Sequence, residues 1–114
     1  MHIPSKSSIN RIVAAASTNS TLIDVGNVQL VGVVMANVSA SDVYVKYYDK
    51  ATAPDETDTP IFTIVVPANS NQAFDFPSRV TTQQGLGVRL TGGAADNDTT
   101  ALSSGDIFAQ TIYI

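Results

Sequence analysis

Few side chains in this sequence are of a type that could carry out catalysis. The one histidine, His2, lies beside the start of the chain, ahead of Pro4, so nothing in the sequence fixes it as the base of a Ser-His-Asp arrangement. Glycosidase chemistry needs two carboxylates at a set separation, but most acidic residues here fall between apolar runs. Asp75, between Phe74 and Phe76, is expected to be a solvated charge on the outer face of a strand. We therefore predict that the chain is not an enzyme and uses no cofactor.

Two acidic segments have residue types that bind calcium. Asp96 and Asp98 stand two residues apart, and the segment 55–58 offers three carboxylates beside prolines. The longer calcium-loop pattern also requires a central glycine and a distal glutamate, and neither segment has them. We predict solvated acidic loops without a metal, with a calcium site as the alternative.

Tyrosines offer a second kind of binding residue. Tyr44 and Tyr48 alternate with apolar residues along one predicted strand and share its polar face. Exposed tyrosines can stack on sugars or anchor a partner protein, whereas the alternative is packing against a neighbouring strand or loop. Together with Asp96 and Asp98 they are the surface-binding candidates.

Composition limits the classes of protein that this chain can belong to. Its 114 residues carry a net charge of -4 and contain no cysteine, which leaves room for one domain without disulfides. The six basic residues are scattered, which argues against nucleic-acid binding. No apolar run approaches the ~20 residues of a membrane helix, and residues 1–12 lack the apolar stretch of a signal peptide. We expect neither a nucleic-acid partner nor a membrane.

Short apolar runs separated by turn residues predict an all-β fold. Valine, isoleucine and threonine make up 34 of the 114 residues, and these β-branched side chains favour strands. The predicted strands cover residues 11–17, 21–25, 28–38, 42–49, 61–66, 72–76, 86–91 and 106–114. Seven or eight short strands indicate an antiparallel β-sandwich of jelly-roll or immunoglobulin-like type. Residues 9–114 would form this single domain, and residues 1–8 an N-terminal arm.

Two of the predicted strands are apolar on both faces. In 28–38, the side chains of Val28, Leu30 and Val34 fall on one face and those of Val31, Val33 and Met35 on the other; 61–66 behaves in the same way. A two-layer sandwich buries one face of each sheet, so a loop, the arm or another subunit must cover the second face. A homo-oligomer is the prediction that we favour. The interface candidates are His2, Ile3 and Pro4 in the arm and Val31, Val33 and Met35 in the strand.

Several stretches of the sequence resemble a known group of viral proteins. They are 44–54 (YVKYYDKATAP), 57–60 (TDTP), 63–67 (TIVVP) and 91–101 (TGGAADNDTTA), about a third of the chain. These stretches resemble small virion-associated structural proteins of tailed bacteriophages, in particular capsid decoration or cement proteins. No catalytic motif accompanies the resemblance.

The resemblance implies a place on the virion. A decoration protein of this kind is a small β-rich domain, often a homotrimer, that binds the major capsid protein on the outside of the shell after synthesis in the host cytoplasm. Arms at the termini often make its contacts. The alternatives from the sequence are a head-fibre or tail-associated part, a module that binds a host glycan or receptor, and an adhesion module of bacterial origin, because fold does not fix function.

Overall fold

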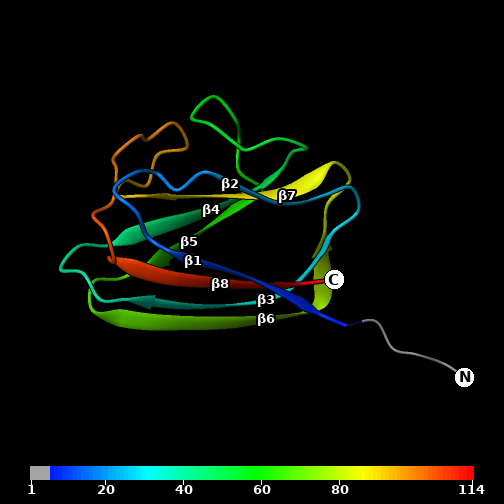
Figure 1. The fold of residues 1–114 in the computed structure, drawn as a ribbon, viewed down its shortest axis with the longest axis horizontal. Coiled ribbons are helices and arrows are strands. Elements are labelled where there is room, and N and C mark those ends of the chain that lie inside the picture. Colours follow the sequence, from blue (N-terminus) through cyan, green and yellow to red (C-terminus); the bar gives the residue numbers. More distant parts are fainter. Residues whose placement is uncertain (1–5) are drawn as a thin grey trace, which may run out of the picture.

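The computed structural model describes residues 6–114 and contains eight strands there. Apolar and polar side chains alternate along most of them, as expected for strands with one face on a core. The strands are β1 (Ser8–Val13), β2 (Thr21–Val25), β3 (Gln29–Asn37), β4 (Val43–Asp49), β5 (Phe62–Val66), β6 (Ser70–Thr81), β7 (Gly85–Thr91) and β8 (Ile107–Tyr113). They form two four-stranded antiparallel sheets with the orders β1-β8-β3-β6 and β2-β7-β4-β5. The two sheets lie face to face (Figure 1), which confirms the predicted antiparallel β-sandwich.

The strand pairing decides between the two sandwich types left open by the sequence. The chain behaves as one long antiparallel ribbon, in which β1 pairs with β8, β2 with β7, β3 with β6 and β4 with β5. Two further pairings, β3 with β8 and β4 with β7, roll this ribbon into the two sheets. A ribbon of eight strands rolled in this way is a jelly roll rather than an immunoglobulin-like fold.

Two strands differ from their predicted bounds by more than one residue at each end. The first strand begins at Ser8, inside the segment assigned to the arm, and it ends before Ala14. The predicted strand 72–76 runs instead from Ser70 to Thr81 and passes through Pro77. A proline is tolerated there because β6 is an edge strand, so the missing N–H removes no hydrogen bond from the ladder.

The core lies between the sheets and is built mainly from aliphatic side chains of β3, β4, β7 and β8. Two side-chain hydrogen bonds link the sheets: the hydroxyl of Tyr47 in β4 lies 2.7 Å from that of Thr111 in β8, and Asn37 Nδ2 in β3 donates to the carbonyl of Val66 in β5 at 2.9 Å. The buried hydroxyls of Tyr47 and Thr111 are thereby paired. Burial raises the pKa of Tyr47, and the bond to Thr111 opposes this only in part.

A β-bulge in β3 decides which side chains reach the core. Against β8, Leu30 and Gly32 pair with the consecutive residues Tyr113 and Ile112, so Val31 is an extra residue in β3. Against β6 the same pairs enclose residues 76–79, so on that side the surplus lies in β6. Leu30 points into the core before the bulge, and Val33 and Met35 point into it afterwards. Because the bulge reverses the alternation, the predicted faces of this strand are wrong beyond Leu30.

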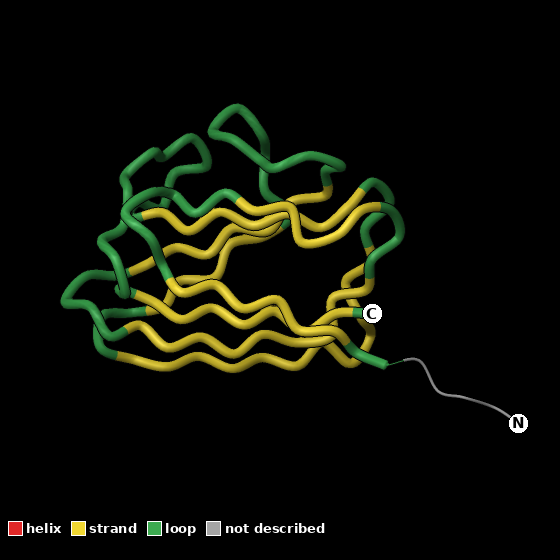
Figure 2. Tube along the Cα trace, in the orientation of Figure 1, coloured by secondary structure: helices red, strands yellow, loops and turns green. Residues whose placement is uncertain are grey.

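The long loops gather over one sheet. Figure 2 shows them on the side of the β2-β7-β4-β5 sheet, where the β4–β5 loop (50–61) and the β7–β8 loop (92–106) rise. Outward-facing residues of this sheet, such as Lys46 and Arg89, are consequently buried. Within residues 6–114, no helix long and apolar enough to cross a membrane is present.

Candidate interaction surface and the loop-covered cations

The outer face of the β1-β8-β3-β6 sheet is a regular grid of side chains. The register places three rows of four residues across the strands β1, β8, β3 and β6. Row one is Ile9, Ile112, Gly32 and Asp75; row two is Arg11, Gln110, Val34 and Ala73; row three is Val13, Phe108, Ala36 and Asn71. Most of these side chains are apolar.

Several of the apolar side chains on this grid are open to solvent. Ile9 is 63% exposed, Val34 45% and Val13 44%. Phe108 is half-buried, and the guanidinium carbon of Arg11 lies 5.9 Å from the centre of its ring, within the range of a cation–π contact. Contiguous exposed apolar side chains on a soluble domain mark a surface where another molecule binds.

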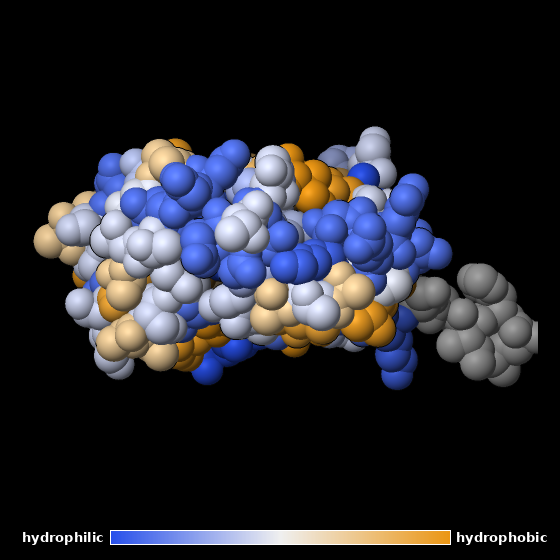
Figure 3. All heavy atoms as spheres, turned by 90° about the horizontal axis from the view of Figure 1, so that it is seen from above, coloured by the Kyte–Doolittle hydropathy of each residue, from blue (hydrophilic) through white to orange (hydrophobic). Residues whose placement is uncertain are grey.

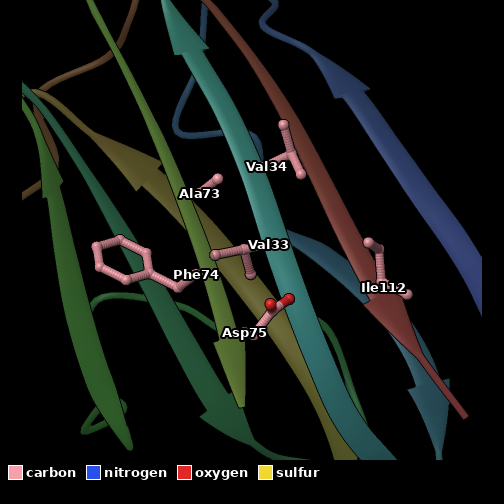
Figure 4. Close-up of a pocket in the computed structure, with 6 residues that line it drawn as sticks. All are labelled: Val33, Val34, Ala73, Phe74, Asp75 and Ile112. Carbon is pink, nitrogen blue, oxygen red and sulfur yellow. The ribbon is translucent and has the colours of Figure 1, made fainter. Parts of the chain in front are cut away.

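A shallow hollow interrupts this grid beside Gly32. It has a volume of about 90 Å3, and its lining includes Val34, Ala73, Asp75 and Ile112 (Figure 4). Gly32 itself is closed off by β6, because a Cβ there would lie 2.9 Å from the carbonyl oxygen of Phe74 and 3.4 Å from Asp75 Oδ1. The site is therefore an apolar depression with one carboxylate at its rim.

The loop-covered side of the molecule has a different chemistry. Figure 3 shows this side as mainly hydrophilic. Beneath the loops, Lys46 of β4 and Arg89 of β7 are direct cross-strand partners, and both are fully buried. Two like charges in such a position would repel unless other groups compensated them.

Loop carbonyl groups provide that compensation. Arg89 Nη2 donates a hydrogen bond to the carbonyl of Asp98 at 2.7 Å, and Nη1 donates to the carbonyl of Asp96 at 3.4 Å and to the hydroxyl of Tyr48 at 3.2 Å. Lys46 Nζ donates to the carbonyl of Ala95. Burial, followed by the nearby charge of Arg89, lowers the pKa of Lys46. The two cations thus hold the 92–106 loop against the sheet and are not open to a ligand.

Interface candidates from the sequence fall into three groups. His2, Ile3 and Pro4 lie outside the described residues. Val33 and Met35 are 1% and 0% exposed in the core, so their assignment to an interface is wrong. The bulge turns both residues inward and leaves Val34, which the sequence placed on the core side, on the outer face. Val31, the bulge residue itself, is half-buried.

The surface-binding candidates are only partly accessible. Tyr48 is 1% exposed beneath the loops, which corrects its placement on an open polar face, and burial raises the pKa of its hydroxyl. Tyr44 is half-buried.

Asp96 and Asp98 in the 92–106 loop lie in different surroundings. Asp96 is exposed, and the carboxylate of Asp98 accepts hydrogen bonds from the N–H and hydroxyl of Thr100 at 2.9 and 3.1 Å. The backbone N–H of Thr100 is the main reason why the pKa of Asp98 is lowered. Across residues 6–114, no three acidic or histidine side chains gather in a way that could hold a metal ion.

Sequence reasoning did not relate two charged residues of the outer face, Arg11 and Asp75, to each other. Asp75 was predicted to be a solvated outer-face charge, and Arg11 was one of several scattered cations. Only the register shows that they stand on the same outer face, at opposite edges of one sheet. A signal was present, because the sequence predicts both as strand residues, but the strand order that relates them depends on the fold.

No family model matches the chain, and no curated protein matches it. Among solved structures, it is similar to two of the Tobacco streak virus coat protein. The C2 crystal form has 11% sequence identity and a TM-score of 0.37, covering 98% of this chain and 88% of that chain. The coat protein dimer has the same identity and TM-score, covering 96% and 86%. Similarity at this level carries no functional argument, so the assignment of a jelly roll rests on the strand order.

Proposed function

We propose that this chain is a structural protein of a virion, and specifically a capsid decoration protein that binds the outside of a tailed-phage shell. The outer face of the β1-β8-β3-β6 sheet, which no loop of residues 6–114 covers, is the observation that carries the proposal, because its exposed apolar side chains suit the protein contacts of a structural protein and not chemistry. The jelly roll adds support, since viral capsid domains use this architecture, as do lectins and cupins. The resemblance in residues 44–54 and 91–101 favours the virion among these.

The use of the titratable side chains also supports a structural role. Lys46 and Arg89 hold a loop, and the carboxylate of Asp49 accepts hydrogen bonds from the backbone N–H groups of residues 83–85. The single ion pair within residues 6–114, between Lys50 and Asp58 at 2.6 Å, braces the β4–β5 loop. These groups secure loops around a stable sandwich, as is expected of a protein that has to withstand conditions outside the cell.

A decoration protein acts by mass action. A chain that binds the assembled shell and not the free major capsid protein lowers the free energy of the shell. Many copies with modest affinity add up through multivalent contact. In this proposal the arm residues His2, Ile3 and Pro4 reach a neighbouring subunit, the chain is made in the host cytoplasm, and it acts on the capsid exterior as a homo-oligomer. The resemblance implies a trimer, whereas pairing through one sheet face, argued below, predicts a dimer, and the measured oligomeric mass distinguishes them.

Co-sedimentation with shells tests the proposal. Purified chain is titrated onto expanded shells that lack it, with free major capsid subunits as the control. We expect saturation at a fixed number of copies per shell and no binding to free subunits. A chain that does not sediment with shells would overturn the decoration role. A glycan and receptor screen would then test the alternative, a head-fibre, tail-associated or host-binding module.

A further inference from the structure

We propose that the outer face of the β1-β8-β3-β6 sheet packs against the same face of a second copy of this chain, about a two-fold axis parallel to the strands. The inference goes beyond the proposed function, because it names the surface that the homo-oligomer uses. It also stands without that function, because it concerns the purified chain alone.

The geometry of the grid selects this axis. Rotation about an axis along the strands, midway between β8 and β3, places β1 over β6 of the second copy and β8 over β3. Each row then meets the same row of the other copy. A two-fold axis across the strands would instead bring Arg11 over Arg11 of the second copy, and like charges face to face are unfavourable.

The same rotation sets the contacts of row one. Ile112 on β8 comes to lie over Gly32 on β3 of the second copy, next to the apolar depression that Val34, Ala73 and Asp75 of that copy line. The contact is made twice, once in each direction, as a two-fold interface requires.

Charge complementarity points to the same partner. Arg11 stands on β1 at one edge of the face, and Asp75 stands on β6 at the other. The rotation brings Arg11 within one row of Asp75 of the second copy, a step of two residues or about 6.6 Å that an arginine side chain can span. Within residues 6–114, neither Arg11 nor Asp75 has an ion-pair partner. On pairing, Arg11 would leave its contact with the Phe108 ring and bind the Asp75 carboxylate of the second copy.

The size of the face indicates a reversible pair. Four strands at ~4.8 Å spacing and six residues at ~3.3 Å rise cover about 19 by 20 Å, or about 400 Å2 in projection. A standard stable interface buries ~800 Å2 of accessible surface on each partner. We therefore expect a dimer whose fraction rises with protein concentration.

Charge reversal in trans is the test. The variants Arg11→Glu and Asp75→Arg are each measured alone and as an equimolar mixture, by sedimentation velocity over a concentration series. Each variant alone should dimerise at least tenfold more weakly than the original chain, because both ion-pair positions become repulsive. In a heterodimer of the two variants, the introduced glutamate faces the introduced arginine, and the unchanged Arg11 of one copy faces the unchanged Asp75 of the other. Dimerisation should therefore return in the mixture.

A matched variant in the other sheet is the control for this test. Asp24→Arg reverses an exposed carboxylate of β2, which lies outside the proposed paired face. It makes the same change of charge as Asp75→Arg, and it should leave dimerisation unchanged.

Three results would overturn the inference. They are a monomer at every concentration, a trimer, and a mixture that dimerises no better than its two components. Circular dichroism of each variant establishes that the sandwich is intact before its mass is interpreted. A chain that is monomeric alone yet saturates shells would assign this face to the capsid and retain the proposed function. A dimer that does not bind shells would retain the pairing and overturn the decoration role. The failure of one proposal is therefore distinguishable from the failure of the other.

Discussion

Val33 and Val34 are neighbours in β3, yet they meet opposite surroundings. Val33 is 1% exposed in the core, whereas Val34 is 45% exposed on the outer face. Val33→Asp places an unpaired charge among aliphatic side chains, which costs several kcal/mol of a total stability of about 5–15 kcal/mol. We expect this variant to be insoluble or unfolded. Val34→Asp should fold, with a free energy of unfolding within about 0.5 kcal/mol of the original chain.

Oligomeric mass distinguishes Val34→Asp from a matched control. Val65 on β5 is also 45% exposed, but it lies in the other sheet. Val34→Asp introduces a charge into the proposed paired face and should yield monomers, whereas Val65→Asp should keep the dimer. Urea unfolding and light scattering provide the two measurements. Equal masses for the two variants would refute a role for Val34 in pairing, and a folded, stable Val33→Asp would contradict the position of the bulge.

At the scale of elements, Asp49 joins the end of β4 to the connection before β7. Its Oδ1 accepts the N–H of Gln84 at 2.8 Å and that of Gly85 at 3.3 Å, and its Oδ2 accepts that of Gln83 at 3.1 Å. Partial burial acts to raise the pKa of this carboxyl, but the three backbone donors together lower it below the usual value. The charged form is therefore favoured by folding.

The pH dependence follows from that direction. Since the pKa of Asp49 is lower in the folded state, its contribution is present above the unfolded pKa of ~3.9 and is lost as the pH falls through the folded value. Asp49→Asn should cost about 1 kcal/mol of unfolding free energy at pH 7, and the difference should narrow towards pH 2. Urea unfolding at both pH values measures it, with Asp24→Asn as the control. If Asp49→Asn lowers the unfolding free energy by the same amount at pH 2 as at pH 7, the negative charge of Asp49 does not contribute to stability.

Arg89 determines how the β7–β8 loop lies on its sheet. Its hydrogen bonds to the carbonyls of Asp96 and Asp98 involve a charged donor, and such bonds contribute about 1.5–3 kcal/mol. Arg89→Met should leave the sandwich folded and raise amide exchange in residues 94–100 on the order of tenfold or more. Lys46 still holds Ala95, so release should be incomplete. Arg89→Lys keeps the charge without the forked geometry of the guanidinium. Its amide exchange in residues 94–100 should lie between that of the original chain and that of Arg89→Met. Unchanged exchange would show that the loop is held by other contacts.

Local pattern predicts the elements better than their faces. Alternation in residues 42–49 and 86–91 locates β4 and β7 almost to the residue, because period-two patterning is a local property. The orientation of Val33 and Val34 was predicted wrongly because a single extra residue, Val31, reverses all that follows in the strand. Gly32, directly after Val31, is a residue type that often marks a bulge, but it does not specify which strand has the extra residue or which side chains then turn inward.

Contacts between residues far apart in the sequence determine which side chains are buried and which share a face. Tyr48 and Lys46 alternate as outward residues should, yet both are buried because the loop beginning at Gly92 folds back over β4. Likewise, the joint position of Arg11 and Asp75 on one face requires the order β1-β8-β3-β6. Pattern reasoning identifies candidate strands and charges, but tertiary contacts decide which of them share a surface.

For the whole molecule, the rolled ribbon gives the two sheets different roles. The β2-β7-β4-β5 sheet is covered by the chain's own loops, which its buried cations hold in place. No loop of residues 6–114 covers the β1-β8-β3-β6 sheet in this way, and that sheet includes the strand that follows the N-terminal residues. The proposed pairing of copies through that sheet and the proposed contact of residues 1–7 with a shell involve adjacent segments, which truncation can separate.

Two truncations test this separation. Removing residues 1–7 leaves β1, which begins at Ser8, so thermal stability and dimerisation should be unchanged while occupancy on shells falls. Removing residues 1–13 also deletes β1, the core contact of Ile12 and the Arg11 side chain. That variant should lose at least about 2 kcal/mol of unfolding free energy and become monomeric or insoluble. Full shell occupancy of the shorter truncation would refute the arm contact, whereas a folded dimer of the longer one would exclude β1 from the paired face.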